Sequence, residues 1–268
     1  MKNFFIWVMF LSITFTSRSQ QEQKTITADS VSFENRLIGE ELTYIVKYAF
    51  FNLGEVKLNV VEKTNIGNTT IYKTIAFIDS YPDLPFVSLH QVYESYIDSS
   101  LYPLKFLAKI FSDSVYVEYN FIGDTKIEIK KGKLDKSKFW FDSTVTINKK
   151  MLDGLSILYF TRMNFGKEQE LKVPCFVNEK QETAILNYYN ESESVSIESI
   201  DYEVDCLYLD GYTDFVSIYG LTGNFEGWFS NDKYFVPIKA KLNVIIGNIT
   251  LELIKWNEEL WNPPLYKN

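Results

Sequence analysis

Hydrophobic and polar side chains alternate along most of the chain. From Leu42 to Phe50 every second residue is apolar or aromatic, and the same pattern recurs most clearly at 200–208, where acidic residues occupy most of the intervening positions. A period of two is typical of a half-buried β-strand. Similar runs predict strands at 56–60, 71–78, 92–97, 104–111, 115–121, 126–130, 238–246 and 249–253.

Turn residues separate these runs at short intervals. Asn52-Leu53-Gly54 predicts a hairpin turn, Gly123-Asp124 and Lys131-Gly132 predict two more, and Gly247-Asn248 suits a type II′ turn because glycine stands first. Short strands joined by tight turns are typical of an antiparallel sheet. We therefore expect a mainly β fold.

One segment has a helical period instead. Leu155, Leu158, Tyr159 and Arg162 recur at helical spacing after Asp153, a residue type that caps helices, and Gly166 stands where such a helix should end. We expect a single helix of about three turns that packs against the sheet.

The chain shows no repeat and no linker long enough to divide it. We expect one β-rich domain at 40–258, preceded by a flexible leader at 20–39 and followed by a short C-terminal tail at 259–268. A chain of this length could also hold two small β domains.

The first 19 residues have the features of a cleavable signal peptide. Lys2 is followed by a short apolar run at 4–11, and Ser17 and Ser19 are small residues at the positions that a signal peptidase reads. No cysteine at the expected cleavage point, near Ser19 or Gln20, could receive a lipid. We expect a soluble, exported, non-lipidated protein of the periplasm, with no transmembrane segment after cleavage.

Charge argues against one class of partner. The formal net charge is −8, and removing Lys2 and Arg18 with the signal peptide would bring it near −10. Nucleic acid binding needs a basic face, so we expect no nucleic acid partner.

Aromatic side chains make up 16% of the chain. They suit a β core with tyrosines at its edges, and they also suit a groove lined by rings for a lipid-like or glycan ligand. Both interpretations remain open at this point.

The sequence contains no recognisable catalytic set. His90 is the only histidine, so a Ser-His-Asp triad would need it, and no nucleophile elbow accompanies it. One histidine and two separated cysteines provide no ordinary zinc site, and no glycine-rich phosphate loop is present. We expect no metal, no cofactor and no enzymatic activity.

Carboxylates leave one enzymatic alternative. A glycan hydrolase needs a pair of them in a cleft. Asp201, Glu203 and Asp205 are explained as the solvated face of a strand. The acidic residues that could hide a pair or a calcium site are Glu191, Glu193, Glu198, Asp201, Glu203, Asp205, Asp210 and Asp214.

Cys175 and Cys206 both fall on the apolar face of an expected strand. We expect both to be buried. An oxidising compartment favours a disulfide between them, but burial alone does not bring two cysteines within bonding distance, so the pairing stays open.

Several of these segments together resemble the exported bacterial proteins of domain-of-unknown-function family 3108 (DUF3108). The middle motif is the most specific, and the likeness spans about 40–256. The residues that carry it are Glu41–Tyr48, Leu53–Glu55, Tyr93–Tyr96, Leu101–Pro103, Asp153–Arg162, Gly227–Asp232 and Val236–Ile238, with the closing hairpin. The resemblance implies an envelope protein with a curved antiparallel sheet, or half-open barrel, wrapped around one helix. It implies no established activity.

On this basis we expect a non-catalytic binding or scaffolding protein with an apolar groove for a lipid-like ligand, between the sheet and the helix. The alternatives are a structural module that binds another envelope protein and a carboxylate-based glycan hydrolase. Asp153 and Arg162 are expected to be structural, with Arg162 reaching a carboxylate such as Glu94 or Asp98. The groove candidates are Tyr44, Tyr48, Phe106, Tyr119 and Tyr159.

Overall fold

A computed structural model describes residues 38–66, 69–82, 84, 88–218, 220–244 and 247–267. The expected signal peptide and the leader up to residue 37 lie outside the described residues.

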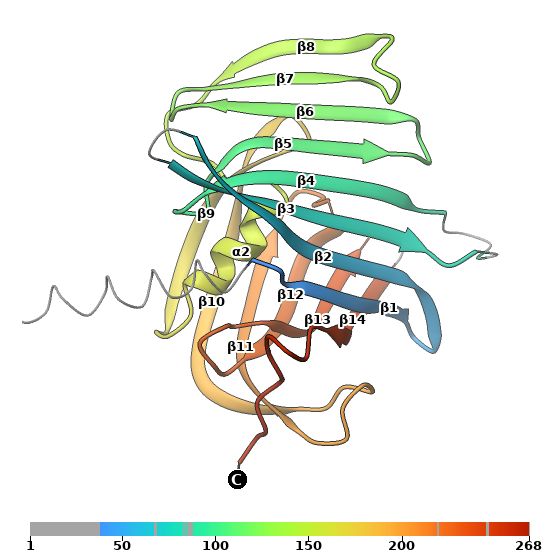
Figure 1. The fold of residues 1–268 in the computed structure, drawn as a ribbon, viewed down its shortest axis with the longest axis vertical. Coiled ribbons are helices and arrows are strands. Elements are labelled where there is room, and N and C mark those ends of the chain that lie inside the picture. The colour runs from blue at the N-terminus through green and yellow to red at the C-terminus, as the bar shows by residue number, and fades with distance from the viewer. Residues whose placement is uncertain are drawn as a thin grey trace, which may run out of the picture.

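The fold is one antiparallel sheet of fourteen strands (Figure 1), which confirms the predicted fold class. The strands pair in the order β8-β7-β6-β5-β4-β3-β2-β1-β14-β13-β12-β11-β10-β9. Their bounds are β1 Glu41–Tyr48, β2 Phe51–Ile66, β3 Thr69–Ser80, β4 His90–Asp98, β5 Pro103–Ile110, β6 Val115–Ile122, β7 Lys126–Lys133, β8 Phe139–Thr146, β9 Gln169–Val177, β10 Lys180–Val195, β11 Val204–Thr213, β12 Leu221–Ser230, β13 Pro237–Val244 and β14 Gly247–Trp256.

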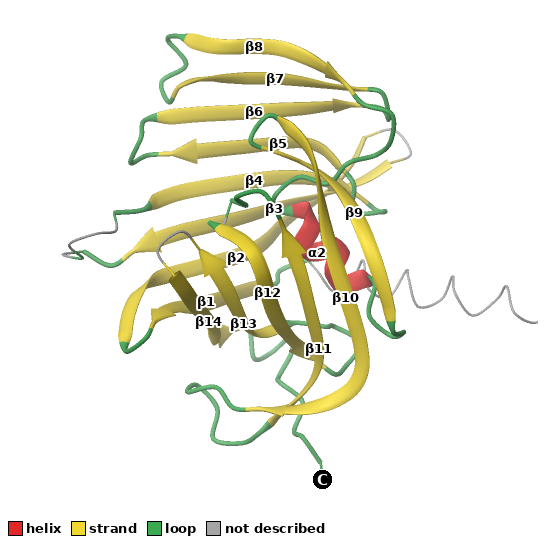
Figure 2. Cartoon of the chain, turned by 180° about the vertical axis from the view of Figure 1, so that it is seen from behind, coloured by secondary structure: helices red, strands yellow, loops and turns green. Residues whose placement is uncertain are grey.

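The sheet curls around the only helix among the described residues, α2, which spans Ser156–Met163 and lies in the concave interior (Figure 2). The end strands β8 and β9 do not pair with each other. Side chains instead connect the N-terminal half of the sheet, β1 to β8, with its C-terminal half, β9 to β14. Glu179, in the β9–β10 turn, accepts hydrogen bonds from Tyr119 Oη at 3.0 Å and from Lys131 Nζ at 2.8 Å. The result is a half-open barrel.

Helix α2 begins as the sequence predicts but is shorter. Asp153 Oδ1 accepts hydrogen bonds from the backbone N–H of Leu155 at 2.8 Å and of Ser156 at 2.7 Å. These bonds satisfy N–H groups that have no partner within the helix. The helix ends at Asn164, whose side-chain amide donates to the carbonyl of Phe160 at 2.8 Å, so it has eight residues rather than about three full turns.

Two glycines that suggested turns lie inside strands. The first hairpin turns at Ala49 and Phe50, and β2 continues through Gly54. A Cβ on Gly54 would lie 2.0 Å from the carbonyl oxygen of Asp79, and one on Gly132 would lie 2.3 Å from that of Lys138. Glycine is therefore required at both positions for the close approach of a neighbouring strand rather than for a turn.

Two boundaries also differ from the sequence prediction. Strand β11 begins at Val204, so residues 200–203 lie outside it and only part of the alternating run at 200–208 forms the strand. The expected C-terminal tail is an integral part of the fold, because Trp261 is buried and donates through Nε1 to Asp232 at 2.6 Å. Further along, the carbonyl of Pro264 accepts from the Asp205 N–H at 2.8 Å.

Candidate functional site

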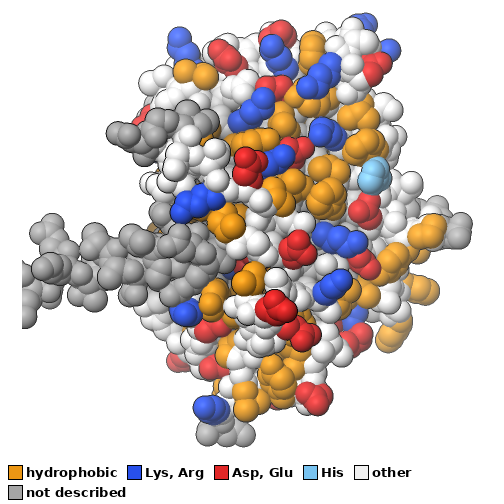
Figure 3. Space-filling model, in the orientation of Figure 1, with side chains coloured by type: hydrophobic (Ala, Val, Ile, Leu, Met, Phe, Trp, Pro, Cys, Tyr) orange, Lys and Arg blue, Asp and Glu red, His pale blue; other side chains and the backbone are white. Residues whose placement is uncertain are grey.

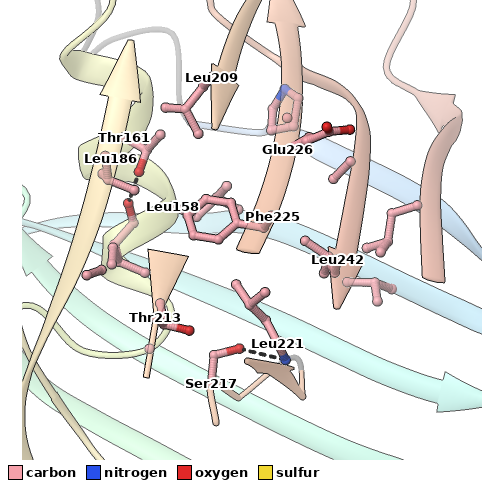
Figure 4. Close-up of a pocket in the computed structure, with 18 of the residues that line it drawn as sticks. Leu158, Thr161, Leu186, Leu209, Thr213, Ser217, Leu221, Phe225, Glu226 and Leu242 are labelled. Atoms are coloured by element: carbon pink, nitrogen blue, oxygen red, sulfur yellow. Dashed lines mark hydrogen bonds between the residues drawn. The ribbon is translucent and has the colours of Figure 1, made fainter. Parts of the chain in front are cut away.

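An apolar cavity lies between helix α2 and the C-terminal half of the sheet (Figure 4). Its volume is about 170 Å³. Dry apolar cavities of about 150 Å³ are known to take up small hydrophobic molecules. The cavity therefore has room for an apolar group the size of a short hydrocarbon segment. We call it the inner cavity.

The walls of the inner cavity come from successive strands of the sheet and from the helix. Leu209 of β11, Phe225 of β12 and Leu242 of β13 contribute from three neighbouring strands, and Ile157 and Leu158 contribute from α2. Side chains two residues apart on a strand share a face. Strands β9 to β14 therefore present a continuous aliphatic and aromatic surface to the helix.

The acidic group at the start of the helix is already satisfied within the protein. Asp153 lines the inner cavity, and its Oδ2 accepts a hydrogen bond from Ser95 Oγ at 2.5 Å, in addition to the two backbone bonds at the start of α2. Burial raises the pKa of this carboxyl, while the bonds from Ser156, Ser95 and Leu155 act in the opposite direction. Asp153 is thus a structural group that joins β4 to the helix, as the sequence predicts.

Two other charged residues at the cavity wall have partners in the sheet. Lys239 Nζ lies 2.8 Å from Glu252, and Glu226 lies 3.3 Å from Lys241 Nζ. Because their charges are paired with neighbouring strand residues, what they add to the wall is mainly backbone and aliphatic surface.

A larger cavity of about 480 Å³ adjoins the inner one, and we call it the outer cavity. The two share the side chains of Val56, Leu242 and Leu251. The outer cavity extends between β1, β2 and β14 to the end of the barrel where Leu89 and Asp113 lie. Its volume falls within the range of about 300–1,000 Å³ that is usual for small-ligand sites.

Of the five groove candidates, the structure places only Tyr44 at the inner cavity, where its hydroxyl donates to the carbonyl of Pro237 at 2.9 Å. Phe106 and Tyr119 stack on each other with ring centroids 5.4 Å apart and fill the core of the N-terminal half. Tyr159 is buried in the same core, and Tyr48 lies on the surface beside Gly247.

The site residues that the sequence analysis missed are mostly aliphatic. Val56, Leu186, Leu209, Leu242 and Leu251 line one or both cavities. Each lies on a strand, but a leucine or valine on an inward face is equally typical of a packed core. The alternating pattern could have marked these residues as inward facing, while only the three-dimensional fold shows the space beside them.

Arg162 is buried and forms a bidentate ion pair with Glu40, not with the predicted Glu94 or Asp98. Its Nη1 and Nη2 atoms lie 2.6 and 2.7 Å from the two carboxylate oxygens. Glu94 pairs with Lys73 and Lys109, and Asp98 accepts from backbone N–H groups of the β4–β5 turn. Glu40 lies directly before β1, at the expected start of the domain, and no pattern in the neighbouring residues marks it as the buried partner of an arginine.

Cys175 and Cys206 are both buried, as predicted, and both are free thiols. They lie on β9 and β11, with β10 between them, opposite Glu182 and Glu193 respectively. Two strand spacings separate them by about 10 Å across the sheet, and the offset along β10 adds more, whereas a disulfide needs Cα atoms within about 7 Å. Burial raises the pKa of the Cys175 thiol to about 12.

The other candidates for chemistry do not line either cavity, although His90 stands between Leu89 and Gln91, which line the outer one. His90 is exposed at the start of β4 and contacts Asp79 at 2.5 Å. Asp205 accepts from Ser192 and Asn231, and Asp210 accepts from Asn187 and Tyr189. Among the described residues, no group of three or more His, Cys, Asp or Glu side chains is placed to hold a metal ion.

Acid is expected to destabilise the fold through buried carboxylates. Burial alone would raise the pKa of Glu94, but Lys109 and Lys73 lower it below its ordinary value of 4.5. Because the pKa is lower in the folded than in the unfolded state, this stabilisation is complete above the unfolded value and is lost as the pH falls through the folded one. The pKa of Glu252 is also lowered, because Lys239 and Lys47 outweigh the effect of burial. Its contribution to stability therefore depends on pH in the same direction.

The test compares Glu94→Gln with the wild type by urea unfolding at several values between about pH 3 and 6. We expect the variant to be less stable at pH 6 and its free energy of unfolding to fall less steeply with acid. Glu258→Gln, at an exposed position, is the matched control and should follow the wild type. Equal acid dependence in all three proteins would contradict the assignment.

Helices long and apolar enough to cross a membrane are absent from the part of the chain described here.

Comparison with known proteins found one matching family model and a solved structure with a similar fold. The model of the family described as "Protein of unknown function (DUF3108)" matches residues 43–254. The comparison with curated proteins found no match. A crystal structure of a β-barrel-like protein of domain of unknown function DUF1849 from Brucella abortus is similar, with a TM-score of 0.50 and 13% identity over 87% of this chain and 99% of that one. This likeness supports the barrel-like fold.

A second solved structure, described as a "putative lipoprotein" from Parabacteroides distasonis, has a TM-score of 0.33 and 10% identity over 83% of this chain and 96% of that one. A likeness of this size carries no argument about function.

Proposed function

Since the chain belongs to the DUF3108 family, whose description states no function, we propose a role from the geometry of its interior: it binds one apolar chain, such as the acyl chain of a lipid. The observation that carries this proposal is the inner cavity, an unfilled space between α2 and the sheet with walls that are almost entirely hydrocarbon. We propose further that it acts as a carrier or sensor in the periplasm, without catalysing a reaction.

The polar groups at the inner cavity favour a lipid over a glycan. A sugar buried in a site needs donors and acceptors for its hydroxyl groups, because an unpaired buried polar group is costly. Asp153, Glu226 and Lys239 are already paired within the protein, and Thr161 donates to the carbonyl of Ile157 at 2.8 Å. A hydrocarbon chain makes no such demand.

The same pairing argues for binding without catalysis. A glycan hydrolase needs two carboxylates with separated proton affinities on either side of its substrate. At the inner cavity, Asp153 is enclosed in a set of structural hydrogen bonds, and Glu226 forms an ion pair with Lys241. This arrangement is typical of carboxylates that are structural parts of a cavity wall rather than of a catalytic acid–base pair.

The structural alternative, a module that only binds another envelope protein, predicts rings that interlock with the helix and leave no void. The N-terminal half of the interior does follow that description, since Phe106, Tyr119 and Phe176 pack against one another. The C-terminal half leaves the inner cavity unfilled. This difference between the two halves favours a ligand.

Titration with cis-parinaric acid, a fatty acid whose fluorescence rises in apolar surroundings, tests the proposal. We expect a saturable signal with one site per chain, displaced by oleate and left unchanged by butyrate or by a soluble oligosaccharide. Butyrate is the control because its chain is too short to extend through both the outer and the inner cavity. A signal that fails to saturate, or that the oligosaccharide displaces, would argue against an acyl-chain site.

A further inference from the structure

The tip of the β1–β2 hairpin is the most exposed apolar feature of the described surface. Phe50 is 99% exposed, Phe51 is 67% exposed and Tyr48 is 39% exposed. Isolated apolar side chains on a surface are common, but adjacent aromatic residues on a projecting turn are candidates for contact with a partner.

The local backbone does not explain this choice of residues. The hairpin turns through Ala49, which adopts a φ of +50°, in the left-handed region that favours glycine or asparagine. Polar turn residues would satisfy the same geometry with less strain and better solvation. The sequence Ala49-Phe50-Phe51 therefore suits something other than the folding of the hairpin.

The tip lies at the mouth of the outer cavity. Val46, Leu53, Gly54 and Glu55, from the two strands of the same hairpin, line that cavity. The β1–β2 turn, the start of β4 and the β5–β6 turn all lie at one end of the barrel (Figures 1 and 2).

Two further apolar side chains lie at this end. Leu89 and Phe111 are each 39% exposed, and the ring of Phe111 lies 4.4 Å from that of His90. On this side of the molecule, hydrophobic side chains are interspersed with charged ones (Figure 3). The opening of the cavity thus combines the exposed apolar side chains of Leu89 and Phe111 with Asp113 and the Asp79–His90 pair.

The tip of the hairpin carries no charged side chain, whereas the rest of the chain carries many. Residues 48–54 contain no charged side chain, although 23% of the chain is charged. The nearest cation, Lys47, is paired with Glu198 and Glu252, and the nearest anion, Glu55, accepts a hydrogen bond from Tyr81 at 3.1 Å. An uncharged tip on a molecule of net charge −8 is complementary to an uncharged, apolar layer rather than to a basic or acidic protein surface.

We propose that this tip inserts into the surface of a lipid bilayer and holds the mouth of the outer cavity against the membrane. Phe50 and Phe51 enter the acyl region, and Tyr48 lies at the level of the headgroups, where amphipathic rings are favoured. The inference rests on the proposed function in one respect: an acyl chain then passes from the membrane through the outer cavity to the inner one.

Co-sedimentation with vesicles of phosphatidylcholine tests the insertion. We expect the wild type to pellet with the vesicles and Phe50→Ser/Phe51→Ser to lose binding by at least about tenfold. The matched control is Phe139→Ser/Trp140→Ser on β8, which removes exposed rings (Trp140 is 51% exposed) from the far end strand of the sheet and should bind as the wild type does. Raising NaCl to 1 M should leave binding unchanged, because no charge attraction is involved.

The proposal would be overturned by a wild type that stays in the supernatant, or by a tip variant that pellets as the wild type does. A wild type that forms dimers through the tip, detected as a doubled mass by sedimentation equilibrium and lost in the tip variant, would also overturn it in favour of a second copy. Circular dichroism and unfolding midpoints confirm that each variant is folded.

Parinaric acid titration without vesicles keeps this test separate from the proposed function. If the tip variant loses vesicle binding but retains the probe, insertion is supported independently of the cavity. If the wild type binds vesicles but not the probe, the cavity proposal fails and insertion stands. A single tryptophan introduced by Phe50→Trp, read by quenching from brominated lipid, reports whether the tip itself enters the bilayer.

Discussion

Replacing Arg162 by methionine is expected to lower the free energy of unfolding by about 3–5 kcal/mol. Both Nη atoms of Arg162 bind Glu40, and Nη2 also donates to the carbonyl of Tyr234 at 3.0 Å. The change leaves the Glu40 carboxylate buried without its counter-charge, and that cost exceeds the loss of the contact itself. Urea unfolding at pH 7 measures the difference.

The double variant Arg162→Met/Glu40→Met separates the two contributions. Replacing both partners of a buried ion pair by apolar residues is often neutral or even stabilising, so we expect it to recover most of the loss. The exposed pair Lys241–Glu226 provides a control, and Lys241→Met should cost less than about 1 kcal/mol. A similarly small loss for Arg162→Met would show that the pair does not join β1 to the helix.

Filling the inner cavity is expected to have the largest effect on binding. Ala240 lies on β13 between Gly227 of β12 and Leu251 of β14, and all three line the cavity. Ala240→Phe adds a ring to a space of about 170 Å³, enough to exclude a ligand segment of that size. We expect affinity for parinaric acid to fall by at least about tenfold, equivalent to 1.4 kcal/mol.

Lys241→Phe is the matched control for this variant. It introduces the same ring at the next residue of β13, on the opposite face of the sheet, where Lys241 is exposed beside Trp228. Its affinity should equal that of the wild type. Equal affinities for both variants, with both folded, would place the probe outside the inner cavity.

The sequence predicts the strands and the start of the helix because both depend on local patterns. Alternation at 42–48 follows from a sheet with one buried face, and the position of Asp153 follows from the unpaired N–H groups of a helix start. Local patterns do not predict the role of Gly54 and Gly132. Each is required by the close approach of a neighbouring strand, which a local pattern cannot distinguish from a turn.

The partner of Arg162 and the cavity depend on contacts between distant parts of the chain. Glu40 lies 122 positions from Arg162, and its neighbours indicate only the end of a polar leader. Of the predicted groove rings, Phe106, Tyr119 and Tyr159 pack in the closed half of the interior, because large rings fill space well. The inner cavity lies instead where small and aliphatic residues such as Ala240 face the helix.

Native mass spectrometry of the protein, purified without detergent from the organism that encodes it, tests the central claim most directly. The account predicts one bound molecule per chain, released by organic solvent and identified as a species with an acyl chain, and lost from Ala240→Phe but retained by Lys241→Phe. A bare chain in every preparation, together with a crystal structure in which side chains fill the space between α2 and β9 to β14, would contradict it.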